Sequence, residues 1–208
     1  GAETAKQLVG KGAPVRALRV TFVGELGWEL HVPVEYALSV YDRVMRAGAE
    51  HGIANAGYRA IDSLRLEKGY KNWGSDLTPN DTPLEAGHAW ATKLKGDVDF
   101  LGRKALEAQK RRPLPKRFAM FSVDDPNVVL LGRETIYRDG VRVGYLTSAG
   151  YGFTVEKGIG YGYVRQPPDA SDDFVTTGRY ELEVTGDLVP SAVHTRPLYD
   201  PTMSRVRS

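Results

Sequence analysis

The amino-acid sequence predicts an α+β fold, in which a ferredoxin-like α+β layer is followed by a small C-terminal β-barrel of jelly-roll-like type. Up to about residue 112, segments with the two-residue alternation of strands are mixed with segments of helical periodicity. From about residue 116, short alternating segments separated by turn residues dominate. A basic, proline-broken run over 110–117 divides the two patterns and is typical of an exposed linker. We therefore predict a lead-in over 1–14, an α+β domain over 15–112 and a barrel domain over 116–208.

The first predicted element is a β-hairpin around the segment FVGELGWELH, Phe22–His31. Residues 1–14 before it are small and polar, so a frayed lead-in is expected there. Apolar and polar residues alternate on both sides of Gly24–Gly27, whose two glycines suit a tight reversal. Glu29 falls on the face opposite the apolar residues of the second strand. From the local pattern alone, Glu29 is most simply a solvated carboxylate.

Two helices are predicted after the hairpin. The first begins at Pro33 and ends near Gly48, because apolar residues recur there at spacings of three and four. The second runs from Tyr58 to about residue 68 and is stopped by a glycine. On the second helix, Asp62 and Arg65 have the i,i+3 spacing of a surface ion pair.

The segment Tyr70–Gly87 is predicted to be a long loop rich in turn residues. Loops of this length without secondary structure are usually functional or disordered, and the large aromatic side chains Tyr70 and Trp73 argue against disorder. A strand is predicted over 89–95, followed by a short helix that Asp99 caps.

The barrel domain is predicted to be all-β, with the Asp139-Gly140 pair forming a hairpin turn. Its many glycines match neither a dinucleotide-binding fingerprint nor a P-loop, because no helix follows them. They are better explained as tight corners of a small barrel. The strands are expected over 117–121, 134–138, 141–147, 161–164, 180–184 and 192–195.

Composition excludes several classes of function. The 28 Lys and Arg residues nearly balance the 26 Asp and Glu residues, so no basic excess indicates nucleic-acid binding. The chain has no cysteine, which excludes disulfides, thiolate catalysis and zinc–sulfur sites, and its four histidines lack ligand spacing, so no metal site is predicted. No apolar run approaches the roughly 18 residues of a membrane span. The N-terminus has no signal-peptide pattern.

Two long motifs carry a resemblance to a known family. FVGELGWELHVP, followed by GYRAIDSLRLEKGYKNWGSDLTPNDTPLEAG, resembles the folate-binding region of the aminomethyltransferase (glycine cleavage T-protein) family. These motifs are most similar to the C-terminal region of sarcosine and dimethylglycine dehydrogenases. The segment TSAGYG resembles the family's barrel domain. The resemblance runs from about Val15 to the C-terminus. The chain is expected to lack the N-terminal part of the family's fold and to begin partway into a domain.

The resemblance implies a tetrahydrofolate site. Glu29 would accept hydrogen bonds from two adjacent donors of the pterin ring, which suits the two coplanar oxygens of a carboxylate. Phe22 would contact the ring, and Arg117 would bind a carboxylate of the folate tail. The aromatic loop would place Trp73 or Tyr70 beside the folate-binding face. These five residues are the candidate cofactor-binding residues.

One departure from the family pattern limits what can be transferred. The T-protein has an arginine where this chain has Ile61, so that contact is not expected here. The family's catalytic aspartate lies upstream of this chain, and no residue present is expected to replace it. FAD is expected only where a parent chain carries an upstream flavin domain.

The reaction that the resemblance implies is transfer of a one-carbon methylene unit from an amine donor to tetrahydrofolate, as part of a sarcosine- or dimethylglycine-demethylating system. The expected partners are folate, a small amine, and the missing N-terminal part or a flavoprotein domain, but neither nucleic acid nor a membrane. The alternative is a non-catalytic regulatory or assembly relative with the same fold. A nucleic-acid module is disfavoured by the charge balance. The expected location is the cytoplasm, or the mitochondrial matrix in a eukaryote.

Overall fold

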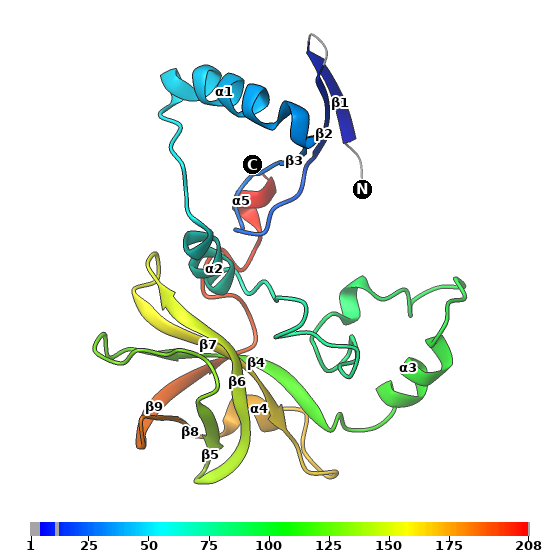
Figure 1. Ribbon diagram of the computed structural model, residues 1–208. Helices are drawn as coiled ribbons and strands as arrows, with labels where there is room; N and C mark the ends of the chain where they lie inside the picture. The colour runs from blue at the N-terminus through cyan, green and yellow to red at the C-terminus, as the bar shows by residue number, and fades with distance from the viewer. Residues whose placement is uncertain (1–4, 11–12, 208) are drawn as a thin grey trace. The chain divides into compact units, whose positions relative to one another are not determined.

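The computed structural model describes residues 5–10 and 13–207, which contain both helices and antiparallel sheets (Figure 1). The chain divides into two compact units, one formed by the residues up to Asp62 together with those from Thr202 onward, and one formed by Ser63–Pro201. The mixed α+β class is confirmed, and so is the C-terminal barrel. The domain limits expected at 112 and 116 stay predictions.

The first unit contains an antiparallel sheet of β1 (Ala5–Gly10), β2 (Ala13–Leu18) and β3 (Glu29–His31). The frayed lead-in expected over 1–14 is wrong for residues 5–10 and 13–14, which belong to the paired strands β1 and β2. The small and polar side chains there did not indicate a strand, because the pairing is made by backbone hydrogen bonds. Residues 1–4 and 11–12 of that lead-in lie outside the described residues.

The predicted hairpin exists, but its turn differs from the prediction. Leu18 pairs with Glu29, so the connection covers 19–28 and the first strand ends before Phe22. The hydroxyl of Thr21 accepts hydrogen bonds from the backbone N–H groups of Val23 at 3.2 Å and Gly24 at 3.1 Å. This local turn replaces the ladder pairing that the sequence alternation predicts.

The helices lie close to their predicted positions. A 3₁₀ turn, η1 (Val34–Tyr36), leads into α1 (Ala37–Gly48), and a second one, η2 (Ala49–His51), follows it. Gly52 ends this helical segment in the left-handed conformation. The next helix, α2 (Tyr58–Glu67), also confirms its prediction, and the residues of its last turn are buried.

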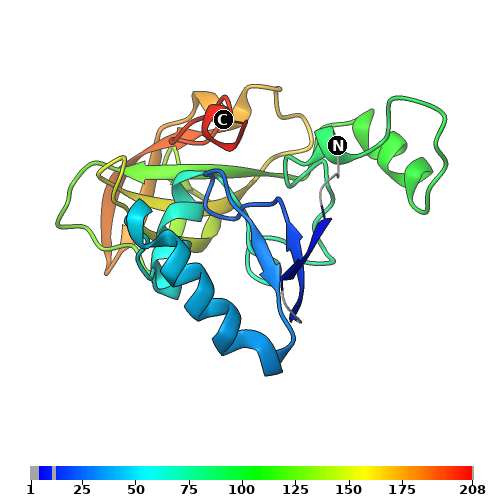
Figure 2. The same ribbon diagram turned by 90° about the horizontal axis from the view of Figure 1, so that it is seen from above.

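The segment after α2 corrects two predictions. The strand expected over 89–95 is wrong, because residues 89–91 form the 3₁₀ turn η3 (Ala89–Ala91) and the Trp90 residue is 84% exposed. Asp99 does not cap the short helix. That helix is α3 (Arg103–Lys110), preceded by Gly102. The segment that carries α3 extends to one side of the barrel in both views (Figures 1 and 2).

The barrel closes into one antiparallel ring in the order β4-β7-β6-β5-β8-β9, with β9 pairing back to β4. Asp139 and Gly140 join β5 to β6 and both have positive φ, as the predicted two-residue turn requires. The all-β expectation is wrong at two single helical turns, α4 (Phe174–Thr177) and α5 (Ser204–Arg207). The strands are β4 (Lys116–Val123), β5 (Thr135–Arg138), β6 (Val141–Gly152), β7 (Lys157–Arg165), β8 (Tyr180–Val184) and β9 (Asp187–His194).

Strand β4 is buried on both of its faces. Phe121 points into the barrel core, while Met120 belongs to a second cluster outside the barrel with Ile159, Tyr161 and Leu66 of α2. A strand that is buried on both faces reads as a nearly continuous apolar run, as FAMF does in β4. The outer face of the barrel therefore receives the last turn of α2.

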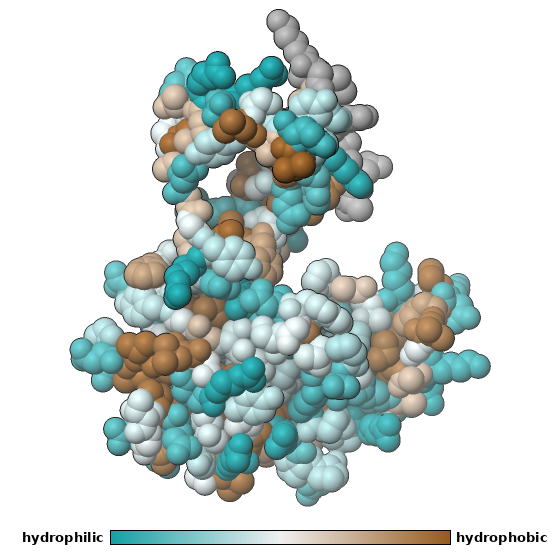
Figure 3. All heavy atoms as spheres, viewed as in Figure 1, coloured by the Kyte–Doolittle hydropathy of each residue, from teal (hydrophilic) through white to brown (hydrophobic). Residues whose placement is uncertain are grey.

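The described surface carries hydrophobic side chains on both units (Figure 3). Helix α1 has no buried residue, and its side chains Leu38, Tyr41 and Val44 are exposed. Within the described residues, none of the helices is long and apolar enough to span a membrane.

We expect Gly144→Ala to destabilise the barrel. A Cβ at Gly144 would collide with the backbone carbonyl oxygen of Tyr163, and neither strand can move without breaking the ring. Overpacking of this kind costs about 2–3 kcal/mol, measured as the free energy of unfolding in denaturant. Gly57→Ala is the matched control, because a Cβ there meets nothing within 4 Å. Equal stability of the two variants would contradict this packing.

Candidate functional site

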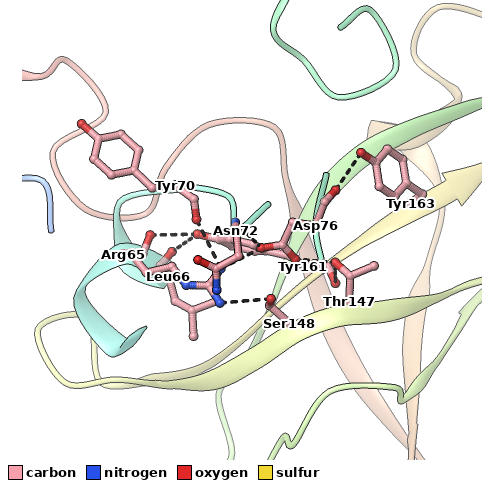
Figure 4. Close-up of polar contacts among 9 residues, drawn as sticks. All are labelled: Arg65, Leu66, Tyr70, Asn72, Asp76, Thr147, Ser148, Tyr161 and Tyr163. Carbon is pink, nitrogen blue, oxygen red and sulfur yellow. Dashed lines mark hydrogen bonds and ion pairs between the residues drawn. The ribbon is translucent and has the colours of Figure 1, made fainter. Parts of the chain in front are cut away.

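A buried ion pair joins α2 to the long loop. The Arg65 guanidinium Nη1 lies 2.8 Å from Asp76 Oδ2, and the two side chains are 4% and 0% exposed (Figure 4). The Arg65 side chain is therefore buried, whereas the sequence predicts a surface position for it. A charge buried to this extent is tolerated only when it is paired and hydrogen-bonded.

Asp76 connects the loop to two barrel strands. Its carboxylate accepts a hydrogen bond from the backbone N–H of Asn72 at 2.9 Å and from the Thr147 hydroxyl of β6 at 2.6 Å. Its backbone carbonyl accepts one from the Tyr163 hydroxyl of β7 at 2.9 Å. Asp76 thus joins the loop to β6 and β7 on the outer wall of the barrel (Figure 4).

Arg65 is held from several directions. Its Nη2 donates to the Ser148 hydroxyl at 3.0 Å and its Nη1 to the Tyr70 carbonyl at 3.3 Å. The Tyr161 hydroxyl donates to the carbonyl oxygens of Arg65 and Leu66 at the end of α2, which also accept hydrogen bonds from backbone N–H groups of the next turn. Burial raises the pKa of Tyr161, so its hydroxyl stays a donor at neutral pH.

Two more charged residues are buried at the end of α2: Glu67, its last residue, and Lys68, which follows it. Glu67 accepts hydrogen bonds from the backbone N–H groups of Thr154 at 2.5 Å and Val155 at 3.1 Å. Lys68 Nζ lies 2.6 Å from the Asp200 carboxylate and also donates to the backbone carbonyl of Asp200 at 2.8 Å. The segment Arg65–Lys68 is therefore a structural anchor, which the sequence periodicity did not reveal.

Lys71 and His88 are two titratable residues that lie near each other on the same unit. Lys71 Nζ lies 4.3 Å from the centroid of the Phe118 ring. Burial lowers the pKa of Lys71, and the charge of Asp76 partly opposes this change. Burial also lowers the pKa of His88, and the Lys71 charge adds to the effect.

Glu29 and Phe22 belong to the first unit. Glu29 lies on β3 with its side chain 57% exposed, and its carboxylate is 3.7 Å from Nε2 of His31, which shares its strand face. Phe22 is an exposed residue of the 19–28 connection. The carboxylate of Glu29 keeps its two acceptor oxygens available to solvent or a ligand.

The other three candidate residues belong to the second unit. Trp73 is 74% exposed at a tight turn, where the Gly74 N–H donates to the Leu77 carbonyl at 2.7 Å. Tyr70 is partly buried, and burial raises the pKa of its hydroxyl. The loop has defined turns, but the Trp73 side chain does not pack into the unit that carries it.

Arg117 lies at the start of β4, in a pocket of about 570 Å³. Its Nη1 donates to the carbonyl of Asp172 at 2.8 Å, which fixes the guanidinium. The pocket also contains three more cations, Lys110, Arg111 and Arg112, against one carboxylate, that of Asp172. Neither Trp73 nor Tyr70 lines this pocket, so the structure does not bring the three candidates of this unit together in one cavity. In the described part of the chain, no cluster of His, Asp or Glu could hold a metal ion.

We expect Asp76→Asn to be severely destabilising, because it leaves the buried Arg65 charge without its counter-charge. The cost of such a change is about 3–5 kcal/mol, measured by denaturant unfolding. Asp124→Asn is the control, since Asp124 pairs with Lys157 at 2.6 Å but is largely exposed. It should change stability by no more than about 1 kcal/mol. A small effect of Asp76→Asn would show that the buried pair is not needed for stability.

Comparison with known proteins gives the family. The model described as GCVT N-terminal domain matches residues 3–96, and the model described as Glycine cleavage T-protein C-terminal barrel domain matches residues 116–200. Mouse sarcosine dehydrogenase is 52% identical over 94% of this chain, which covers 21% of that protein. The aminomethyltransferase of Halothermothrix orenii is 35% identical over 86% of this chain, which covers 50% of that protein.

A regulatory protein and a solved structure are also similar. The mouse pyruvate dehydrogenase phosphatase regulatory subunit is 41% identical over 86% of this chain, which covers 22% of that protein. The crystal structure of aminomethyltransferase T from Bartonella henselae matches with a TM-score of 0.77 over 90% of this chain and 50% of that one, at 23% identity. That likeness concerns the fold. With both family models matched in order, the chain belongs to the glycine cleavage T-protein (aminomethyltransferase) family.

Proposed function

We propose that this chain is the tetrahydrofolate-binding region of a protein that transfers a methylene unit from an amine donor to tetrahydrofolate. The observation that carries the proposal is the match, in order, of both aminomethyltransferase-type domain models. Relatives named sarcosine dehydrogenase and dimethylglycine dehydrogenase support an N-methylated amino acid as the amine donor. Because the chain spans about a fifth of their length, the activity belongs to a longer assembly.

Recognition of the pterin ring is assigned to Glu29 and Phe22. A carboxylate can accept hydrogen bonds from an amino group and a neighbouring ring N–H in one plane. The exposed side chain of Glu29 is available for this contact. The exposed Phe22 supplies an apolar surface for the ring. Tyr70 and Trp73 are proposed to border the folate-binding face.

Recognition of the folate tail is assigned to Arg117. The hydrogen bond to the Asp172 carbonyl uses one guanidinium N–H, so the remaining donors can bind a carboxylate. Lys110, Arg111 and Arg112 line the same pocket and make it attractive to an anion. The cation-rich lining supports this placement of the tail.

Catalysis is assigned to groups outside this chain. No residue here takes the role of the family's aspartate, and FAD enters only through a flavoprotein domain of the assembly. The chain's own residues would bind and orient tetrahydrofolate while the amine and the flavin are supplied elsewhere. The mitochondrial names of several relatives support the mitochondrial matrix over the cytoplasm.

A non-catalytic role is the second candidate function. The similarity to a pyruvate dehydrogenase phosphatase regulatory subunit supports it, because that relative is named for regulation. In this case the same fold would serve assembly or control of another enzyme. Tetrahydrofolate binding distinguishes the two candidates.

We expect Glu29→Gln to weaken tetrahydrofolate binding about a hundredfold, because the new amide N–H₂ would face a ring donor. Titration calorimetry on the purified protein measures this, with Glu50→Gln, an exposed acid of the same unit, as the control. Stability should not change in either variant. Equal affinities for wild type and Glu29→Gln would remove Glu29 from the site. Absence of binding in the wild type would favour the regulatory role.

We expect Arg117→Gln to act on the tail and not on the pterin. Tetrahydrofolate should bind about tenfold more weakly, while a tetrahydropterin without the tail should bind as it does to the wild type. Arg142→Gln, an exposed cation on β6, is the control. If both ligands lost the same affinity, Arg117 would not contact the tail.

A further inference from the structure

A second pocket lies on the outer wall of the barrel, between β4, β6, β7 and the 75–81 part of the loop. Its volume is about 330 Å³. We propose that this pocket binds a small organic anion with one carboxylate group. The proposal goes beyond folate binding and does not depend on it. The residues that line the pocket are Ser75, Thr78, Asn80, Asp81, Lys116, Gly144, Tyr145, Thr147, Tyr163 and Arg165.

The lining offers hydrogen-bond donors that the protein does not use. Within the described residues, the side chains of Ser75, Asn80, Tyr145 and Arg165 make no hydrogen bond or ion pair. Each of the four can donate to an oxygen atom. A ligand rich in acceptors would satisfy them together.

The only carboxylate in the lining is already fully engaged. Asp81 Oδ1 accepts from Lys116 Nζ at 2.5 Å, and its Oδ2 accepts from the backbone N–H and hydroxyl of Thr78 at 2.8 and 2.7 Å. Burial opposes ionisation of Asp81, but these hydrogen bonds outweigh it and lower its pKa. Asp81 is therefore charged at neutral pH and fixes Lys116, and it is not free to bind a cation.

The charge of the pocket favours a monoanion. Lys116 and Arg165 contribute two positive charges, and Asp81 removes one, which leaves a single net positive charge at neutral pH. A guanidinium matches a carboxylate in bidentate geometry, so Arg165 is the expected main contact. Lys116 keeps two further N–H donors for the same ligand.

The walls of the pocket are fixed before a ligand arrives. Thr147 and Tyr163 donate their hydroxyl hydrogens to the carboxylate and carbonyl of Asp76. Lys116 lies 4.6 Å above the Tyr163 ring. Thr147 also occupies an irregular register position between β6 and β7, and bulges of this kind often re-aim side chains at binding sites.

This pocket is separate from the one that contains Arg117. Lys116 and Arg165 are paired neighbours across β4 and β7, whereas Arg117 is the next residue along β4. Consecutive residues of a strand point to opposite faces. The two pockets share no lining residue, so they can be tested independently.

The test is an NMR titration of the protein with acetate, propionate and inorganic phosphate at constant ionic strength. We expect saturable shifts of the Arg165 side-chain Nε–H signal and of the Asn80 and Gly144 backbone amides with both carboxylates, and weaker binding of phosphate. Arg165→Gln should weaken carboxylate binding at least tenfold, and Arg142→Gln should leave it unchanged.

Each outcome decides the proposal. Absence of saturable shifts at these positions, or equal affinity in Arg165→Gln, would overturn it. Tighter binding of phosphate than of acetate would overturn the assignment to a single carboxylate. The wild-type shift map stands by itself if Arg165→Gln fails to fold, because the affected amides locate the ligand. Loss of folate binding in a separate assay would bear on the proposed function and not on this pocket.

Discussion

The ion pair between Arg65 and Asp76 is the interaction on which the arrangement of the second unit depends. Removing both charges from water is costly, and their attraction offsets that cost only if every remaining hydrogen-bonding group finds a partner. Ser148, Thr147 and the backbone of the loop supply those partners. The pair therefore fixes a helix end, a loop without regular secondary structure and two barrel strands in one arrangement.

The same arrangement explains how a loop of this length can be ordered. The backbone of 70–81 makes several turn hydrogen bonds, such as those from the N–H groups of Asp76 and Leu77 to the Asn72 carbonyl, and side chains accept from further N–H groups. Asp76 and Asp81 each bind a backbone N–H near them, and each is held in turn by a cation from α2 or β4. With its backbone fixed by these carboxylates, the loop can leave Trp73 exposed to a ligand or partner.

The barrel was predictable from sequence because most of its strands alternate and are separated by turn residues. The Asp139-Gly140 turn is the clearest case, since few residue pairs adopt positive φ twice in succession. The buried charges were not predictable in this way. Arg65, Glu67 and Lys68 follow the polar side of a helical pattern, and a sequence cannot show that a barrel wall covers that side. The strand predicted around Trp90 is wrong for the opposite reason. Alternation around a large apolar residue suggests a strand even where no neighbouring strand pairs with it.

The candidate folate-binding residues were chosen by resemblance to the family. For Arg117, the structure adds a description of the pocket around it. Arg117 stands in a pocket with three further cations, and all four belong to the basic run over 110–117, which the sequence pattern indicates only as an exposed linker. Strand β4 begins with two cations in succession, and the alternation of a strand sends them to opposite faces. Arg117 keeps most of its donors free, whereas Lys116 is tied to Asp81. Two adjacent residues of equal charge thus have different capacities for an anion, and the difference arises from one acidic residue on the neighbouring loop.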